Sequence, residues 1–146
     1  MKRILVDASV LIAGSCSLTG ASRVVLTLAE VGMFRIVVTR QILDESERNL
    51  RKKAPTVLPE FTEILARSAP ELLPDPGLDA SIRWHNFIHI NDAPILEAAV
   101  TTQVARLFTL NTRHFTQKVA DLTGITIQTP SQFVQELRSI VTAGLD

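Results

Sequence analysis

The stretch that decides the fold is residues 2–12, which read KRILVDASVLI. Its apolar run, residues 4–6, is typical of a buried strand and stops at Asp7. Small and apolar residues follow and predict a short helix over residues 9–14. In an open α/β sheet, ligands bind outside the carboxyl ends of the strands. We therefore expect Asp7 to lie where chemistry usually occurs in such folds.

The rest of the chain alternates between strand and helix patterns. The predicted strands are residues 34–38, 106–110 and 125–127, with a short edge strand within residues 72–77. The predicted helices are residues 21–31, 41–52, 57–68, 92–103, 116–122 and 133–141. Residues 78–90 fit neither period and are expected to form a helix followed by a strand or loop. This alternation predicts an α/β fold with three layers, α/β/α, around a mostly parallel central sheet of about five strands. One domain is expected to span residues 1–146.

Composition excludes several classes of protein. The 146 residues are 46% hydrophobic and 21% charged, with a formal net charge of zero. The neutral balance excludes attraction of nucleic acid to the whole surface, although a local basic patch remains compatible with it. The single cysteine, Cys16, cannot form an intramolecular disulfide and is expected to be a packing residue. Because Asp7 interrupts the N-terminal apolar run and no stretch has the length of a membrane span, we expect a cytoplasmic protein without a membrane partner.

Asp92 begins the clearest helical pattern of the chain. At 3.6 residues per turn, Ile95, Leu96 and Ala99 lie within about 60° of it, so its carboxylate starts the buried face of the helix. The same geometry predicts that Glu97 points toward solvent. A carboxylate on the core side needs a partner, because burial of a lone charge is costly. The alternative is that Asp92 only caps the helix, since a proline follows in the first turn.

The predicted helix over residues 41–52 carries three carboxylates, Asp44, Glu45 and Glu47. Asp44 points away from the apolar face, and the two glutamates lie on its opposite flanks. Periodicity alone does not choose between Glu45 and Glu47. Acidic residues early in a helix also favour its dipole, and Glu47 with Arg51 is an ordinary surface pair.

Two other sets of polar residues have less specific interpretations. His85 and His89 are four residues apart, but no cysteine or third histidine lies at ligand spacing, so a structural or surface role is expected. Ser9 lacks the flanking glycines of a nucleophile elbow. We interpret its hydroxyl as one that orients Asp7 or a metal-bound water.

Five segments, in this order, resemble the PIN-domain nucleases, which include the VapC-type toxins of bacterial toxin–antitoxin pairs. They are ILVDASVL at 4–11, ILDE at 42–45, NDAPILEAA at 91–99, LFTLNTRHF at 107–115 and GITIQTP at 124–130. No single segment is specific, but the ordered set spans nearly the whole chain.

The resemblance implies a ribonuclease whose acidic residues hold Mg²⁺ or Mn²⁺. Asp7, Glu45 and Asp92 match the first three carboxylates of the family, which selects Glu45 over Glu47. Hard divalent ions prefer oxygen ligands and bind through a few carboxylates, waters and substrate phosphate. Such an ion can activate a water for attack on a phosphodiester and stabilise the leaving oxygen.

The chain departs from the family pattern after its last-but-one strand. The family often has a fourth acidic residue there, and here Asn111 and His114 occupy the region. Asn111 can orient water or ligate through its carbonyl, but it brings no charge. We therefore expect one metal held by the protein, with any second recruited by substrate. Thr109 and Arg113 are candidates for phosphate contacts, the alternative for Arg113 being a plain surface residue.

The resulting hypothesis is a metal-dependent endoribonuclease that prefers single-stranded RNA and acts as the toxin of a toxin–antitoxin pair. A cognate antitoxin would restrain it, with a basic side chain among the carboxylates. Because members of the family commonly dimerise, a homodimer is expected. The alternative is a PIN-like module without cleavage that binds RNA or a protein, which the missing fourth carboxylate and the neutral net charge favour.

Overall fold

The computed structural model describes residues 1–145, which form a five-stranded parallel sheet in the order β3-β2-β1-β4-β5. The strands are β1 Arg3–Val6, β2 Arg35–Thr39, β3 Glu71–Leu73, β4 Arg106–Phe108 and β5 Thr126–Gln128. All four neighbouring pairs are parallel. The predicted α/β class and the five-stranded parallel sheet are confirmed.

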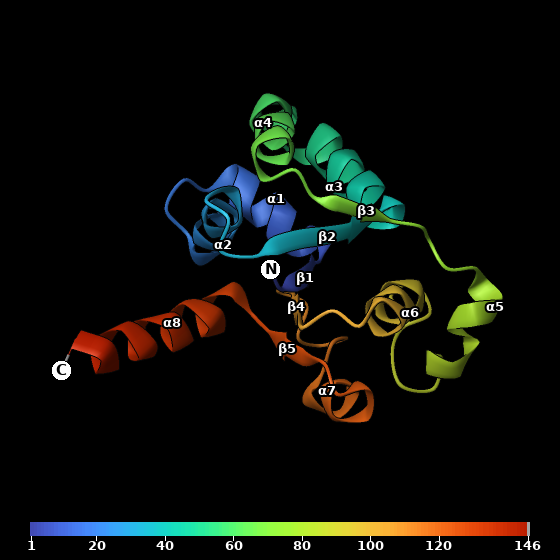
Figure 1. Cartoon of the computed structure of the whole chain (residues 1–146). Helices are drawn as coiled ribbons and strands as arrows, with labels where there is room; N and C mark the ends of the chain where they lie inside the picture. Colours follow the sequence, from blue (N-terminus) through green and yellow to red (C-terminus); the bar gives the residue numbers. More distant parts are fainter. Residues whose placement is uncertain (146) are drawn as a thin grey trace.

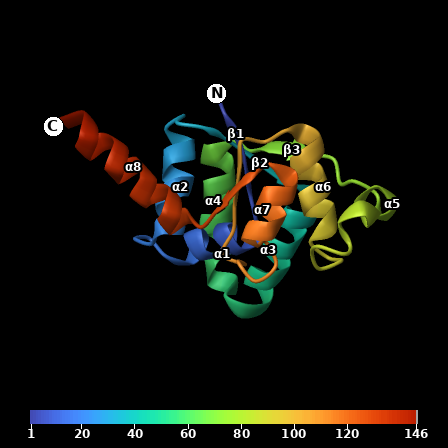
Figure 2. The same ribbon diagram turned by 90° about the horizontal axis from the view of Figure 1, so that it is seen from below.

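Helices cover both faces of this sheet. They are α1 Ala8–Cys16, α2 Ala21–Glu30, α3 Arg40–Lys53, α4 Leu58–Ser68, α5 Leu78–Ser81, α6 Ala93–Thr102, α7 Gln117–Thr123 and α8 Pro130–Leu145, with single 3₁₀ turns η1 Pro55–Val57 and η2 Ile82–Trp84. Figure 1 shows α1 to α4 on one side of the sheet and α6 and α7 on the other, so the three expected layers are present. Figure 2 shows the C-terminal end of α8 projecting beyond the body of the molecule.

The central strand β1 is buried along most of its length. Leu5 and Val6 have no exposed surface, as expected of a parallel strand covered on both faces. The chain builds the sheet outward from β1, first through β2 to β3 and then, on the other side, through β4 to β5. The chain therefore adds strands away from β1 on one side of the sheet and away from β4 on the other, so the topological switch point lies between β1 and β4. Such a switch point opens a crevice at the carboxyl ends of the two strands, and Asp7 follows β1 directly at this point.

Residues 78–90 contain α5, the turn η2 and a loop, without the strand that the sequence left open. Ser81 is buried, and its hydroxyl donates to the Gly77 carbonyl at 3.1 Å. The segment lies beside α6 (Figure 1). The segment is therefore a short cover over α6. It lacks both the length of a regular helix and the alternation of a strand, which is why its sequence fits neither period.

The prediction that Glu97 points toward solvent was wrong, because its exposed fraction is 4%. Arg83 donates to both of its carboxylate oxygens at 3.0 and 2.7 Å, and the Trp84 indole donates at 3.1 Å. The guanidinium of Arg83 also lies 4.6 Å from the centre of the Trp84 ring. The periodicity placed Glu97 correctly on the outer face of the helix. It does not reveal, however, which other segment of the chain covers that face.

Cys16 is exposed at the end of α1, so the expectation that it is a packing residue was also wrong. Within residues 1–145, no single helix has the length and apolar composition needed to cross a membrane. Together α1 and α2 meet the criterion, but they are bent by 98° to each other.

Candidate active site

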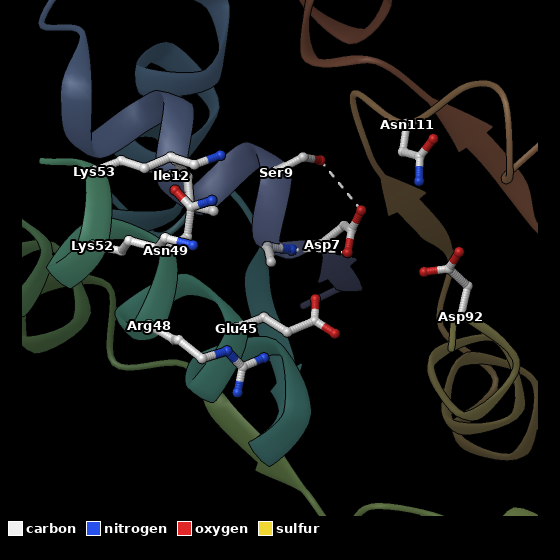
Figure 3. Close-up of a pocket in the computed structure, with 11 residues that line it drawn as sticks. Asp7, Ser9, Ile12, Glu45, Arg48, Asn49, Lys52, Lys53, Asp92 and Asn111 are labelled. Carbon is white, nitrogen blue, oxygen red and sulfur yellow. Dashed lines mark hydrogen bonds between the residues drawn. The ribbon is translucent and has the colours of Figure 1, made fainter. Parts of the chain in front are cut away.

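A cavity of about 500 Å³ opens at the carboxyl end of β1, between α1, α3 and the start of α6. Four residues predicted to take part in catalysis line it: Asp7, Glu45, Asp92 and Asn111. Figure 3 shows the three carboxylates and the amide pointing toward a common space from four separate parts of the chain. The structure therefore brings together residues that are up to 104 positions apart in the sequence.

Asp7 is the most enclosed of these side chains, with 6% of its surface exposed. Its carboxylate accepts hydrogen bonds from the Ala8 backbone N–H at 2.8 Å, the Thr109 hydroxyl at 2.8 Å and the Ser9 hydroxyl at 3.2 Å. Burial raises the pKa of Asp7 above its ordinary value, the three donors oppose that rise, and the nearby charge of Asp92 adds to it. Asp7 is therefore fixed in position while its charge is incompletely compensated, which favours binding of a cation.

The hydroxyls of Thr109 and Ser9 are held in place by the chain after β4. The Thr109 oxygen accepts from the Asn111 N–H at 2.9 Å, and the Ser9 oxygen accepts from the Leu110 N–H at 3.0 Å. Thr109 has no exposed surface, and its hydroxyl positions Asp7. Its contact with substrate phosphate stays a prediction. Ser9 orients Asp7, as one of its sequence interpretations expected, and it also lines the cavity.

Asp92 immediately precedes α6, but its side chain accepts no capping hydrogen bond. Its Oδ2 lies 2.5 Å from Nδ1 of His114, and 16% of its side-chain surface is exposed. The His114 ring stacks on His89 with centroids 5.2 Å apart and planes within 4° of parallel. The side chain of Asp92 therefore does not cap the helix. The partner that a carboxylate on the core side of the helix requires is His114.

His114 is the main residue of this site to which the sequence analysis gave no role. The only sequence signal was its place in the segment where the family often has its fourth acidic residue. Spacing could not indicate the contact, because Asp92 and His114 are 22 residues apart and lie in different elements.

Glu45 enters the cavity from α3, whereas Glu47 does not line it. The side-chain amide of Gln41 donates to Oε1 of Glu45 at 3.1 Å and to the Asn91 carbonyl at 2.7 Å. Gln41 thus connects α3 to the residue before Asp92. Glu47 pairs with Arg51 at 2.8 Å on the exposed side of α3, the ordinary surface pair considered from the sequence.

Arg113 is exposed and does not line the cavity, so its contact with substrate stays a prediction. Sequence reasoning also gave no role to Arg48, Lys52 and Lys53, which line the cavity from the C-terminal half of α3. They are visible in the sequence as ordinary exposed cations of a helix. Only the fold shows that they share a cavity with the carboxylates.

The donor set around the cavity is chemically suited to a hard divalent cation. It consists of carboxylate and amide oxygens, with no sulfur ligand. Within residues 1–145, no three histidine, cysteine, aspartate or glutamate side chains lie close enough together to form a complete metal centre. Mg²⁺ keeps several waters and is typically bound through one or two carboxylates, so the oxygen donors that line the cavity are compatible with it.

The fold and the cavity together define a class of protein: a parallel α/β domain with acidic residues gathered at the switch point of its sheet. Residues 3–113 match the family described as "PIN domain". The chain therefore belongs to the PIN domain family. No match was found among curated proteins.

Solved structures show the same fold. PAE2754 from Pyrobaculum aerophilum is 20% identical, with a TM-score of 0.64 over 92% of this chain and 88% of that one. VapBC2 from Rickettsia felis, solved bound to a DNA fragment from its promoter, is 14% identical, with a TM-score of 0.65 over 87% and 98% of the two chains. FitAcB from Neisseria gonorrhoeae is 20% identical, with a TM-score of 0.63 over 87% and 97%.

Proposed function

We propose that this chain is a divalent-metal-dependent endoribonuclease and the toxin of a toxin–antitoxin pair. The observation that carries the proposal is the convergence of Asp7, Glu45 and Asp92 on one cavity, from three elements far apart in the sequence. PIN domain proteins are generally nucleases that use Mg²⁺ or Mn²⁺. Single-stranded RNA is the proposed substrate.

Asp7 and Asp92 are the proposed metal-holding residues, with Glu45 on the facing helix. A bound divalent ion would activate a water and stabilise charge on the leaving oxygen. Asp7 needs no rearrangement to bind, because three donors already fix its carboxylate. Glu45, oriented by Gln41, is placed to accept a hydrogen bond or a proton from the attacking water. The Asn111 amide is placed to orient water or a phosphate oxygen without adding charge.

The test is cleavage of a mixed single-stranded RNA pool in Mg²⁺ or Mn²⁺. Asp7→Asn and Asp92→Asn should each lower the cleavage rate by more than about 100-fold, since even residues that only support metal ligands are worth 10–100-fold. Glu45→Gln should also lower the cleavage rate. Its matched control is Asp44→Asn, because Asp44 lies on the same helix, is exposed and does not line the cavity. Equal cleavage by wild type and both aspartate variants would refute the assignment.

A PIN module that binds RNA or protein without cleavage is the second candidate. Asn111 favours it, because an amide stands in the region where the family often has a fourth carboxylate. Calorimetry with Mn²⁺ separates the two functions. Saturable binding that is lost in Asp7→Asn supports the nuclease, whereas no binding at millimolar Mn²⁺ supports the inactive module.

The proposal includes a cognate antitoxin, a homodimer and a cytoplasmic site of action. Solved structures of similar fold include VapBC2 bound to a DNA fragment from its promoter, and FitAB bound to a DNA fragment. Co-expression with the product of a neighbouring small reading frame should yield a complex with suppressed cleavage. Sedimentation of the isolated chain should give the mass of a dimer.

A further inference from the structure

The acidic cavity has a cationic side that the proposed chemistry does not use. Arg48, Lys52 and Lys53 line it from α3, and together they are called the cationic strip here. All three are exposed, and no ion pair within residues 1–145 engages them. Figure 3 shows Arg48, Lys52 and Lys53 on α3, with Glu45 on the same helix nearer to Asp7 and Asp92.

Helix stabilisation alone does not explain the strip. Cations in a last turn favour the helix dipole, and Arg51, Lys52 and Lys53 all lie in the last turn of α3. Arg51, however, pairs with Glu47 at 2.8 Å outside the cavity, whereas its two neighbours line the cavity. Arg48 lies before the last turn. The helix dipole therefore explains why basic residues lie at this end of α3. It does not explain why the three residues of the strip lie on the side that faces the cavity.

Charge balance in the cavity indicates an anionic ligand. Three carboxylates and three cations line it, so its formal charge is zero without a metal ion. A bound divalent cation would leave a surplus of two positive charges. The two lysines are also displaced from the carboxylates: Lys52 is seven residues beyond Glu45, which is about 10 Å along the helix axis at 1.5 Å per residue, whereas Arg48 is three residues beyond Glu45.

We propose that the cationic strip binds backbone phosphates of the substrate strand on one side of the scissile bond. The strand then runs from the carboxylates toward the C-terminal end of α3. A rise of about 3.4 Å per nucleotide holds for a stacked duplex strand, and an extended single strand covers more, so a distance of 10 Å corresponds to at most about three nucleotides. This inference rests on the proposed function and adds a directional requirement to it: the flank of the cut that faces the strip must carry up to about three nucleotides to reach Lys52, and the strip makes no such demand on the other flank.

Binding tests the strip independently of cleavage. A labelled single-stranded RNA decamer is titrated by fluorescence anisotropy against Glu45→Gln protein, which keeps both proposed metal-holding aspartates, in Mg²⁺ at several salt concentrations. Each phosphate contact contributes about 0.7 to the slope of log affinity against log salt, so replacing the whole strip with glutamine should reduce that slope by about 2. The control replaces Arg51, Lys118 and Arg138 with glutamine. These exposed cations lie outside the cavity, and their loss changes the net charge equally.

An unchanged slope in the strip variant, or an equal reduction in the control, overturns the inference. Thermal melting of all variants verifies that they are folded. If binding follows the prediction but no protein cleaves RNA, the strip stands and the nuclease proposal fails.

Cleavage tests the direction. With wild-type protein, trimming the flank that faces the strip to a single nucleotide should raise KM with little change in kcat, whereas the same trimming of the other flank should raise KM less. The strip variant should lose this asymmetry. A symmetric response of the wild type to both truncations contradicts the proposal even when cleavage itself is robust.

Discussion

Asp7 and Asp92 serve the same cavity but are held in opposite ways. Asp7 is enclosed by two hydroxyls and one backbone N–H, all supplied by strand ends and the first turn of α1. Asp92 follows an irregular segment and contacts one half-exposed histidine. The comparison teaches that one side of the site is built into the sheet, whereas the other depends on a cover of short helical turns.

The largest expected effect concerns the support of Asp7. Thr109→Val removes a buried donor that water cannot replace, and Asp7 then keeps only Ala8 and Ser9. Cleavage rate or Mn²⁺ affinity should fall by about 10–100-fold, as for other residues that support a metal ligand. Kinetics and calorimetry on the same preparation measure both. Unchanged values would mean that the enclosure of Asp7 does not matter to its function.

The next prediction concerns the ion pair between Arg83 and Glu97, which joins the segment before Asp92 to α6. Arg83→Met leaves the buried Glu97 carboxylate with Trp84 as its remaining side-chain donor, so the free energy of unfolding should fall by about 1–3 kcal/mol. The matched control is Arg51→Met, which breaks an exposed pair on α3 and should change stability by less than about 0.5 kcal/mol. Urea denaturation measures both. Equal losses of stability in Arg83→Met and Arg51→Met would show that the buried pair of Glu97 with Arg83 stabilises the fold no more than the exposed pair does.

The direct partner of Asp92 should matter less than that of Asp7. In His114→Ala a water can replace the lost contact, because 41% of the histidine side chain is exposed. We expect less than a tenfold loss of cleavage rate, smaller than that of Thr109→Val. A larger loss would reverse the comparison between the two carboxylates and assign His114 a direct part in the chemistry.

The smallest expected effect is on the pH dependence of the free energy of unfolding of the metal-free protein. Because the pKa of Asp7 is raised in the fold, the native state binds more protons than the unfolded state between the unfolded and folded pKa values. The free energy of unfolding should therefore fall as pH rises through that window. Asp7→Asn should remove this decline, while Asp44→Asn, on an exposed surface, should retain it. Urea titrations in chelator from about pH 4 upward test the sign.

The parts of the molecule that the sequence predicted are those with a strong local pattern. An apolar run ending in Asp7 indicated both the central strand and its functional end, and the periodicity after Asp92 indicated a core-facing carboxylate. The choice of Glu45 over Glu47 needed the family resemblance, because local periodicity is symmetric between them. The inferences about Asp7 and Asp92 used only residues within one element or at its end.

What escaped prediction depends on contacts between distant elements. Glu97 is buried because residues from the segment before α6 cover it, and Thr109 supports Asp7 from 102 residues away. Neither contact leaves a periodic signal in the sequence. The cationic strip was likewise not predictable, since the sequence does not show which cavity the exposed cations of α3 line until α3 is placed beside α1.

The separation of Asp7 and Thr109 has a consequence for how the protein is made. Asp7 is among the first residues of the chain, but its enclosure requires β4 to pair beside β1, as the Asp7 N–H bond to the Phe108 carbonyl shows at 3.0 Å. Closing a loop of this length is slow compared with forming local helices. A nascent chain therefore carries its carboxylates without a working geometry until residue 109 has emerged and docked. If the chain is a toxin, the ribosome that synthesises it is exposed to no active nuclease until most of the domain is complete.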